Sequence, residues 1–226
     1  MSDILQQVAI WSLPVLFAIT VHEAAHGWVA LQLGDDTARR LGRVTLNPLK
    51  HIDLVGTVIL PLLTFMLSGL IFGWAKPVPV NWHNLKQPHR DMALVALAGP
   101  GANLLMAILW ALVAKFGWFL VHEGFAPAIF FFYMGGAGIL INVLLMILNL
   151  MPILPLDGGR VLYSLLPKHL AALFGRLEPF GLIILLVLLV IGALEIIFIP
   201  LIKLAYGQIA SLVALSEPLS QLIGNF

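Results

Sequence analysis

The chain has no cysteine and few charged residues. Without cysteine it can form no disulfide and cannot use a thiol nucleophile. Charged residues make up only 10% of the 226 residues and hydrophobic ones 61%, whereas about 25% of residues are charged in a soluble domain. Too little polar material remains to cover a globule in water, so we expect an integral membrane protein. The net charge of +1, with basic residues scattered among loops, also excludes a nucleic-acid-binding surface.

The sequence contains several long apolar runs. A helix needs about 20 apolar residues to cross the hydrocarbon core of a bilayer. Runs of this kind occupy 4–33, 54–74, 92–121, 126–151 and 181–199, and a weaker sixth run, beyond the break expected at Pro200, covers 201–215. We therefore predict an all-α polytopic membrane protein with a single domain over residues 1–226.

The segments between the runs are a polar loop at 34–53, a proline-rich one at 75–91 and an amphipathic stretch at 160–174. Alternation in "RRLGRVTLNPL" (39–49) favours a short strand ended by Asn-Pro. "KPVPVN" (76–81) favours extended backbone, because each proline biases the residue before it away from helix. Ordinary loops are the alternative. We predict a short β-hairpin or re-entrant extended segment near the active site, with 42–47 as a substrate-binding edge and 76–80 as its support.

Two histidines and a glutamate lie inside the first apolar run, in "TVHEAAHGWVA" (20–30). Residues four apart share one face of a helix, so His22 and His26 can bind one metal ion while Glu23 lies beside it. Zinc accepts neutral imidazole ligands and activates water, whose proton Glu23 could take. Buried hydrogen bonds between helices are the alternative. Ionisable groups in a membrane helix are costly, which favours a functional site.

A catalytic zinc needs a third protein ligand, and "NLMPILPLDGGR" (149–160) offers one. Pro152 and Pro155 should unwind the helix after the fourth run. Unwound backbone at membrane depth requires protein or a water-filled cavity around it, which suits a hydrolytic site. Asp157 is the candidate ligand, and an N-cap on the following helix is its alternative role.

Together these motifs resemble the site-2 proteases, a family of intramembrane zinc metalloproteases. The family signatures are HExxH and a downstream Asn-x-x-Pro…Leu-Asp-Gly, matched here by 22–26 and by Asn149, Pro152 and 156–158. "AGPGANLL" (98–105) is similar to the family's Gly-Pro-x-x-Asn stretch, at Gly99, Pro100 and Asn103. The resemblance covers most of the chain.

The resemblance implies that His22, His26 and Asp157 bind one Zn²⁺ per chain. Glu23 is then the general base, and Asn149 a donor to the scissile carbonyl or its oxyanion. The implied substrate is a transmembrane protein, cleaved within the bilayer. The implied location is the plasma membrane of a prokaryote, with the active site nearer the cytoplasmic side, although loop charges do not fix the orientation.

The implied architecture is a catalytic core of three spanning helices, in a minimal form without a regulatory domain. Four crossings before Asp157 would separate it from the HEAAH helix, so we expect the run at 54–74 to be re-entrant. "VHEG" (121–124) begins like HExxH, but residue 126 is alanine, so we expect no site there.

Two other function classes remain open at this point. A metal-ion transporter also places ionisable residues at membrane depth. Two histidines and one carboxylate also form the iron site of non-haem oxygenases. The substrate's identity and the oligomeric state do not follow from the sequence.

Overall fold

The structure is a computed structural model that describes residues 2–53, 56, 59 and 76–223. Helices make up the regular structure of these residues, and none of them lies in a strand. Five helices in this part of the chain are long and apolar enough to cross a membrane: Leu5–Gln32, Pro88–His122, Ala126–Asn149, Lys168–Val190 and Ala193–Leu212. The prediction of an all-α polytopic protein is confirmed.

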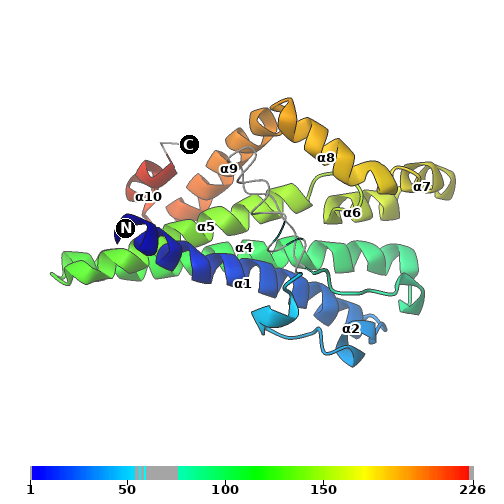
Figure 1. Cartoon of the computed structure of the whole chain (residues 1–226), viewed down its shortest axis with the longest axis horizontal. Coiled ribbons are helices and arrows are strands. Elements are labelled where there is room, and N and C mark those ends of the chain that lie inside the picture. The colour runs from blue at the N-terminus through cyan, green and yellow to red at the C-terminus, as the bar shows by residue number, and fades with distance from the viewer. Residues whose placement is uncertain (1, 54–55, 57–58, 60–75, 224–226) are drawn as a thin grey trace.

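Three helices form the centre of the molecule. Figure 1 shows α1 (Ser2–Gln32), α4 (Pro88–His122) and α5 (Ile129–Asn149) running alongside one another, and each of them contacts the other two. Consecutive core helices run in opposite directions. The C-terminal half of α1, the N-terminal half of α4 and the C-terminal end of α5 therefore share one end of the bundle.

The described residues between α1 and α4 lie at this shared end. The N–H of Lys76 donates to the carbonyl of His51 at 2.9 Å, so the residues on either side of 54–75 lie together. The predicted re-entrant run at 54–74 itself falls outside the described residues, apart from Gly56 and Ile59. The three core helices alone bring the HEAAH segment and Asp157 to the same end of the bundle.

The described residues outside these three helices pack around this centre. The amphipathic stretch forms two short helices, α6 (Asp157–Leu165) and α7 (Lys168–Gly175). Figure 1 shows α8 (Gly181–Val190) and α9 (Ala193–Leu212) arching over α5, and α10 (Ser216–Ile223) returning towards the N-terminus. The remaining elements are single turns: α2 (Thr37–Arg40), η1 (Pro48–Lys50), η3 (Trp82–Asn84), η4 (Ala126–Ala128) and η5 (Glu178–Phe180).

The expected break at Pro200 is wrong. Pro200 lies inside α9, and the chain turns instead at Gly192, whose φ of 72° places it in the left-handed region. Glycine adopts that region at little cost. A proline within an apolar helix removes one backbone hydrogen bond, which neighbouring groups can offset in a membrane protein.

The predicted β-hairpin is also wrong. Around 42–47 the chain makes a turn at Gly42, where φ is 63°, followed by bends. Local side-chain bonds compete there with strand pairing, because Asn47 accepts from the N–H of Leu49 at 3.1 Å and Thr45 accepts from Asn47 at 3.2 Å. In the described part of the chain, residues 76–81 lie in neither a helix nor a strand, and Pro77 and Pro79 cannot donate to a ladder.

Candidate metal centre

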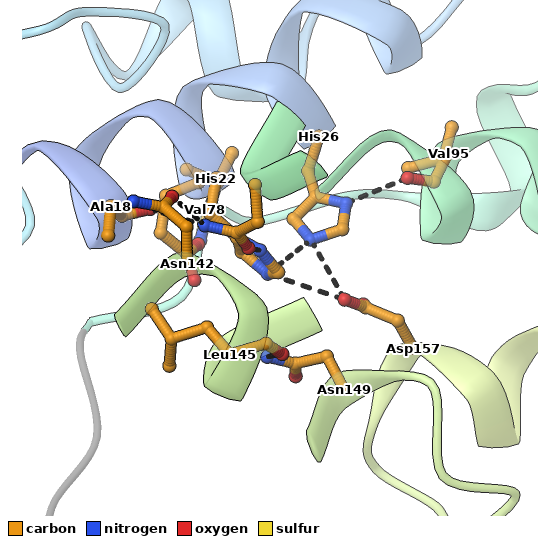
Figure 2. Close-up of polar contacts among 11 residues, drawn as sticks. Ala18, His22, His26, Val78, Val95, Asn142, Leu145, Asn149 and Asp157 are labelled. Atoms are coloured by element: carbon orange, nitrogen blue, oxygen red, sulfur yellow. Dashed lines mark hydrogen bonds and ion pairs between the residues drawn. The ribbon is translucent and has the colours of Figure 1, made fainter. Parts of the chain in front are cut away.

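Three potential metal ligands from two helices meet at one point. His22 and His26 lie one turn apart on α1, and Asp157 is the first residue of α6. The two Nε2 atoms are 3.0 Å apart, and Asp157 Oδ2 lies 3.3 Å from that of His22 and 3.4 Å from that of His26. Ligands about 2.0–2.1 Å from a tetrahedral zinc lie about 3.3 Å from one another. Figure 2 shows the three side chains pointing toward one another.

The break after α5 brings Asp157 to this point. Helix α5 ends at Asn149, and residues 150–156 form turns before α6 begins, as the two prolines predicted. Gly158 and Gly159 lie in the first turn of α6, where any Cβ would collide with backbone atoms of residues 150–154. The absence of side chains at both positions lets the start of α6 approach the loop closely.

Asp157 does not cap α6. The N-cap residue is Leu156, and no side chain makes a cap hydrogen bond there. The Asp157 side chain is 15% exposed, and its buried Oδ2 makes no hydrogen bond within the described part of the molecule.

Both imidazoles are oriented by hydrogen bonds at Nδ1. His26 Nδ1 lies 2.7 Å from the carbonyl of Val95, which can only accept, so this nitrogen carries the proton. His22 Nδ1 lies 2.6 Å from Asn103 Oδ1. A neutral histidine protonated at Nδ1 presents a lone pair at Nε2. Each histidine, when neutral, therefore directs an acceptor at Asp157.

The assignment at His22 depends on a chain of two buried asparagines. Asn142 Nδ2 donates to the carbonyl of Gly138 at 2.8 Å, so its Oδ1 faces Asn103. Asn103 Nδ2 donates to that oxygen at 2.9 Å and to the carbonyl of Ala18 at 3.1 Å. Asn103 Oδ1 must then accept from His22 Nδ1–H. Both asparagines are fully buried.

The three potential ligand atoms of His22, His26 and Asp157 fit a cation. When both histidines are neutral, their Nε2 lone pairs and the Asp157 carboxylate face one another within 3.4 Å, with no hydrogen-bond donor among them. Any side chain at Gly99 of α4 would collide with His22 and His26, so glycine keeps this space open. Three converging acceptors repel each other unless a positive charge lies between them. Imidazole and carboxylate are ligands that zinc takes in catalytic sites.

The asparagine chain should affect metal binding without touching the metal. We expect Asn103→Leu to lower zinc affinity by about 10- to 100-fold, the usual effect of losing a partner of a ligating histidine. Asn142→Leu should cause a smaller loss, because Asn103 keeps its bonds to His22 and Ala18. Competition with a chromophoric chelator measures both affinities. Wild-type zinc affinity in Asn103→Leu would mean that the hydrogen bonds of the two asparagines do not orient His22.

Each of the two predicted catalytic residues makes a hydrogen bond to a backbone group. Glu23 is half-buried, and its Oε2 accepts a hydrogen bond from the N–H of Val78 at 2.7 Å. Asn149 is half-buried at the end of α5, where its Nδ2 donates to the carbonyl of Leu145 at 3.0 Å (Figure 2). Asn149 thus bonds to its own helix and not to the three ligands. The catalytic roles of both residues stay predictions.

Asn142 and Val78 were not identified from the sequence. Asn142 is a buried amide within an apolar helix, and a polar residue at membrane depth is itself a functional signal. That signal could have identified Asn142. Val78 contacts Glu23 through its backbone N–H, which the side-chain identity does not reveal.

The fold and the site define a class: a helical, membrane-type protein with a possible metal centre made by a His-Glu-x-x-His helix and a distant aspartate. Comparison with known proteins agrees. The chain is 35% identical over 210 residues, 91% of each chain, to a Bacillus subtilis protein named "Putative zinc metalloprotease YwhC". It is 33% identical over 181 residues to "Putative zinc metalloprotease Rip2" of Mycolicibacterium smegmatis, covering 80% of this chain and 66% of the relative.

A Mycobacterium tuberculosis protein, also named Rip2, is 27% identical over 173 residues, or 76% of this chain and 63% of the relative. No protein-family model and no solved structure matches the chain. The extent of the likeness to YwhC and Rip2 is decisive: the chain belongs to the site-2 protease family.

Proposed function

We propose that the protein is an intramembrane zinc endopeptidase that hydrolyses peptide bonds within or near transmembrane helices of membrane-protein substrates. One observation carries the proposal. Three acceptors, from His22, His26 and Asp157, converge among helices apolar enough to span a bilayer, and Glu23 lies next to His22 in the chain. The zinc metalloprotease names of the relatives support the same chemistry.

In this proposal His22, His26 and Asp157 hold one Zn²⁺ per chain. Zinc in such a site polarises the substrate carbonyl and lowers the pKa of a water molecule towards neutrality. Glu23 takes a proton from the attacking water and then delivers it to the leaving amine. The carboxylate must keep one oxygen free for this transfer. Its other oxygen, Oε2, accepts from Val78.

Asn149 is the proposed donor to the scissile carbonyl oxygen as negative charge develops on it. Its Nδ2 must leave the carbonyl of Leu145, a change that rotation of the side chain allows. We expect Asn149→Ala to lower turnover by about 100-fold, the scale of losing one oxyanion donor, with zinc content unchanged. Single-turnover assays and metal analysis measure the two quantities. An unchanged turnover would leave Asn149 with a local structural role only.

The proposed partners are a transmembrane protein substrate and the lipid bilayer. A transmembrane helix satisfies its scissile amides internally, so local unwinding must precede cleavage. Substrates with glycine or proline near the cleaved bond should therefore react faster. The proposed location is the plasma membrane of a prokaryote, with the active site nearer the cytoplasmic side; the bacterial origin of the relatives supports the prokaryotic source.

Reconstitution tests the proposal. The purified protein is placed in lipid vesicles with a single-span model substrate, and the products are identified by mass spectrometry. We expect cleavage within or next to the substrate's apolar segment, loss of activity with a chelator, and recovery with Zn²⁺. Bound iron in place of zinc in the purified protein, without cleavage, would favour the non-haem iron enzyme. Metal flux across the vesicle membrane without cleavage would favour the transporter.

A further inference from the structure

The side chains of Glu23, Asp35 and Arg43 make hydrogen bonds to the backbone of the extended segment 76–81. Arg43 Nη2 donates to the carbonyl of Lys76 at 2.8 Å and to that of Pro77 at 3.3 Å. Glu23 Oε2 accepts from the N–H of Val78 at 2.7 Å. The hydrogen bond between Val78 and Glu23 therefore joins this segment directly to the predicted general base.

The far end of the segment is fixed by a buried carboxylate. Asp35 is fully buried, and its Oδ2 accepts from the N–H of Asn81 at 2.7 Å. Its Oδ1 accepts from Asn84 Nδ2 at 2.9 Å and from the N–H of Thr37 at 3.1 Å. Burial raises the pKa of Asp35, but the bonds from Thr37, Asn84 and Asn81 outweigh burial and lower the pKa. An ionised acceptor with several donors makes a strong anchor.

The sequence of the segment leaves Val78 as its central donor. Pro77 and Pro79 have no N–H, so Val78 supplies the one backbone donor of residues 77–79. Its side chain is 7% exposed and packs toward Gly27, where a Cβ would lie 3.0 Å from Val78 Cγ1. Gly27 follows Glu23 by one helical turn, so Val78 is held against the same face of α1 that carries Glu23.

We propose that the Val78 N–H positions the Glu23 carboxylate for catalysis. The bond fixes Oε2 and leaves Oε1 to accept the proton of water. A free glutamate side chain samples several rotamers, and a charge-assisted hydrogen bond to a pinned backbone selects one of them. The inference rests on the proposed function, because it assigns Glu23 the role of base.

Val78→Pro tests the inference in the full-length protein in lipid vesicles. Proline removes the N–H and suits extended backbone, whereas Val78→Ala, the matched control, keeps the N–H and trims the side chain. We expect Val78→Pro to lower kcat by about 10- to 100-fold, the scale of a misplaced catalytic group. KM and zinc content should match those of Val78→Ala. Equal kcat values in the two variants would overturn the inference, and so would faster cleavage by Val78→Pro, since the bond would then restrain the base.

Amide hydrogen exchange gives a second readout that needs no substrate and no Val78 variant. Between Lys76 and Val80, Val78 is the residue with an exchangeable amide. Glu23→Gln keeps a side-chain acceptor for that amide, and Glu23→Ala removes it. We expect exchange at Val78 to be about tenfold faster in Glu23→Ala than in Glu23→Gln. Equal rates would overturn the inference, whereas failure of the wild-type protein to cleave any substrate would reject the proposed function alone.

Discussion

Glu23→Gln should abolish peptide-bond cleavage while zinc remains bound. Glutamine has the shape of glutamate and can still accept from the Val78 N–H, but it cannot take a proton from water. The three ligands are untouched, so the metal site should stay intact. Loss of a general base lowers turnover by about 100- to 10,000-fold. Product formation in lipid vesicles and the zinc content of the purified variant are the two measurements.

The second His-Glu pair of the chain provides a matched control. Glu123 follows His122 at the C-cap of α4 and is exposed. It belongs to "VHEG" (121–124), which lacks a second histidine four residues after His122. We expect Glu123→Gln to cleave at the wild-type rate. Near-normal cleavage by Glu23→Gln, with one zinc per chain, would reject Glu23 as the base.

The helical core and the juxtaposition of candidate ligands were predictable because both follow from strong local constraints. The bilayer requires about 20 apolar residues in each span, and this pattern is visible without tertiary information. The spacing of His22 and His26 places both on one helix face. The prolines after Asn149 end α5 and so bring Asp157 back to the same end of the core. Few other arrangements satisfy these three constraints together.

The errors lie where several local solutions compete. Alternation over 42–47 favoured a strand, but Thr45 and Asn47 use their side chains to make short-range bonds with the backbone. Pro200 was expected to end a helix, yet it lies inside α9. The chain turns instead at Gly192, just before α9 begins. The deciding energies in both cases are about 1–3 kcal/mol. Differences of this size depend on neighbours that one sequence does not specify.

The orientation of the ligands needed the structure. The Nδ1 partners of the histidines are an amide of α4 and a backbone carbonyl of α4, 81 and 69 residues away in the chain. Asn142 bonds to Asn103 and acts on His22 through it. The sequence identified polar residues in apolar helices but not the order in which they bond. That order determines which nitrogen of His22 carries the proton.

Asp157→Ala should lower zinc affinity by more than about 100-fold, beyond the effect of losing an outer partner of a ligand. The substitution leaves His22 and His26 as the two protein ligands of the site, where catalytic zinc has three. In the wild-type protein, Asp157 Oδ2 makes no hydrogen bond in the described residues. The substitution should therefore lower metal affinity without removing a helix cap. Competition with a chromophoric chelator gives the affinity.

A structural carboxylate serves as the control for Asp157. Asp91, in the first turn of α4, is 3% exposed, and its Oδ2 accepts from the N–H of the N-cap residue Gln87 at 2.8 Å. Asp91→Ala should cost about 1 kcal/mol of stability, as the loss of a helix cap does, and leave zinc affinity unchanged. Asp157→Ala should show the opposite pattern. Equal zinc affinities in the two variants would remove Asp157 from the metal site and leave it as a residue at a helix N-terminus.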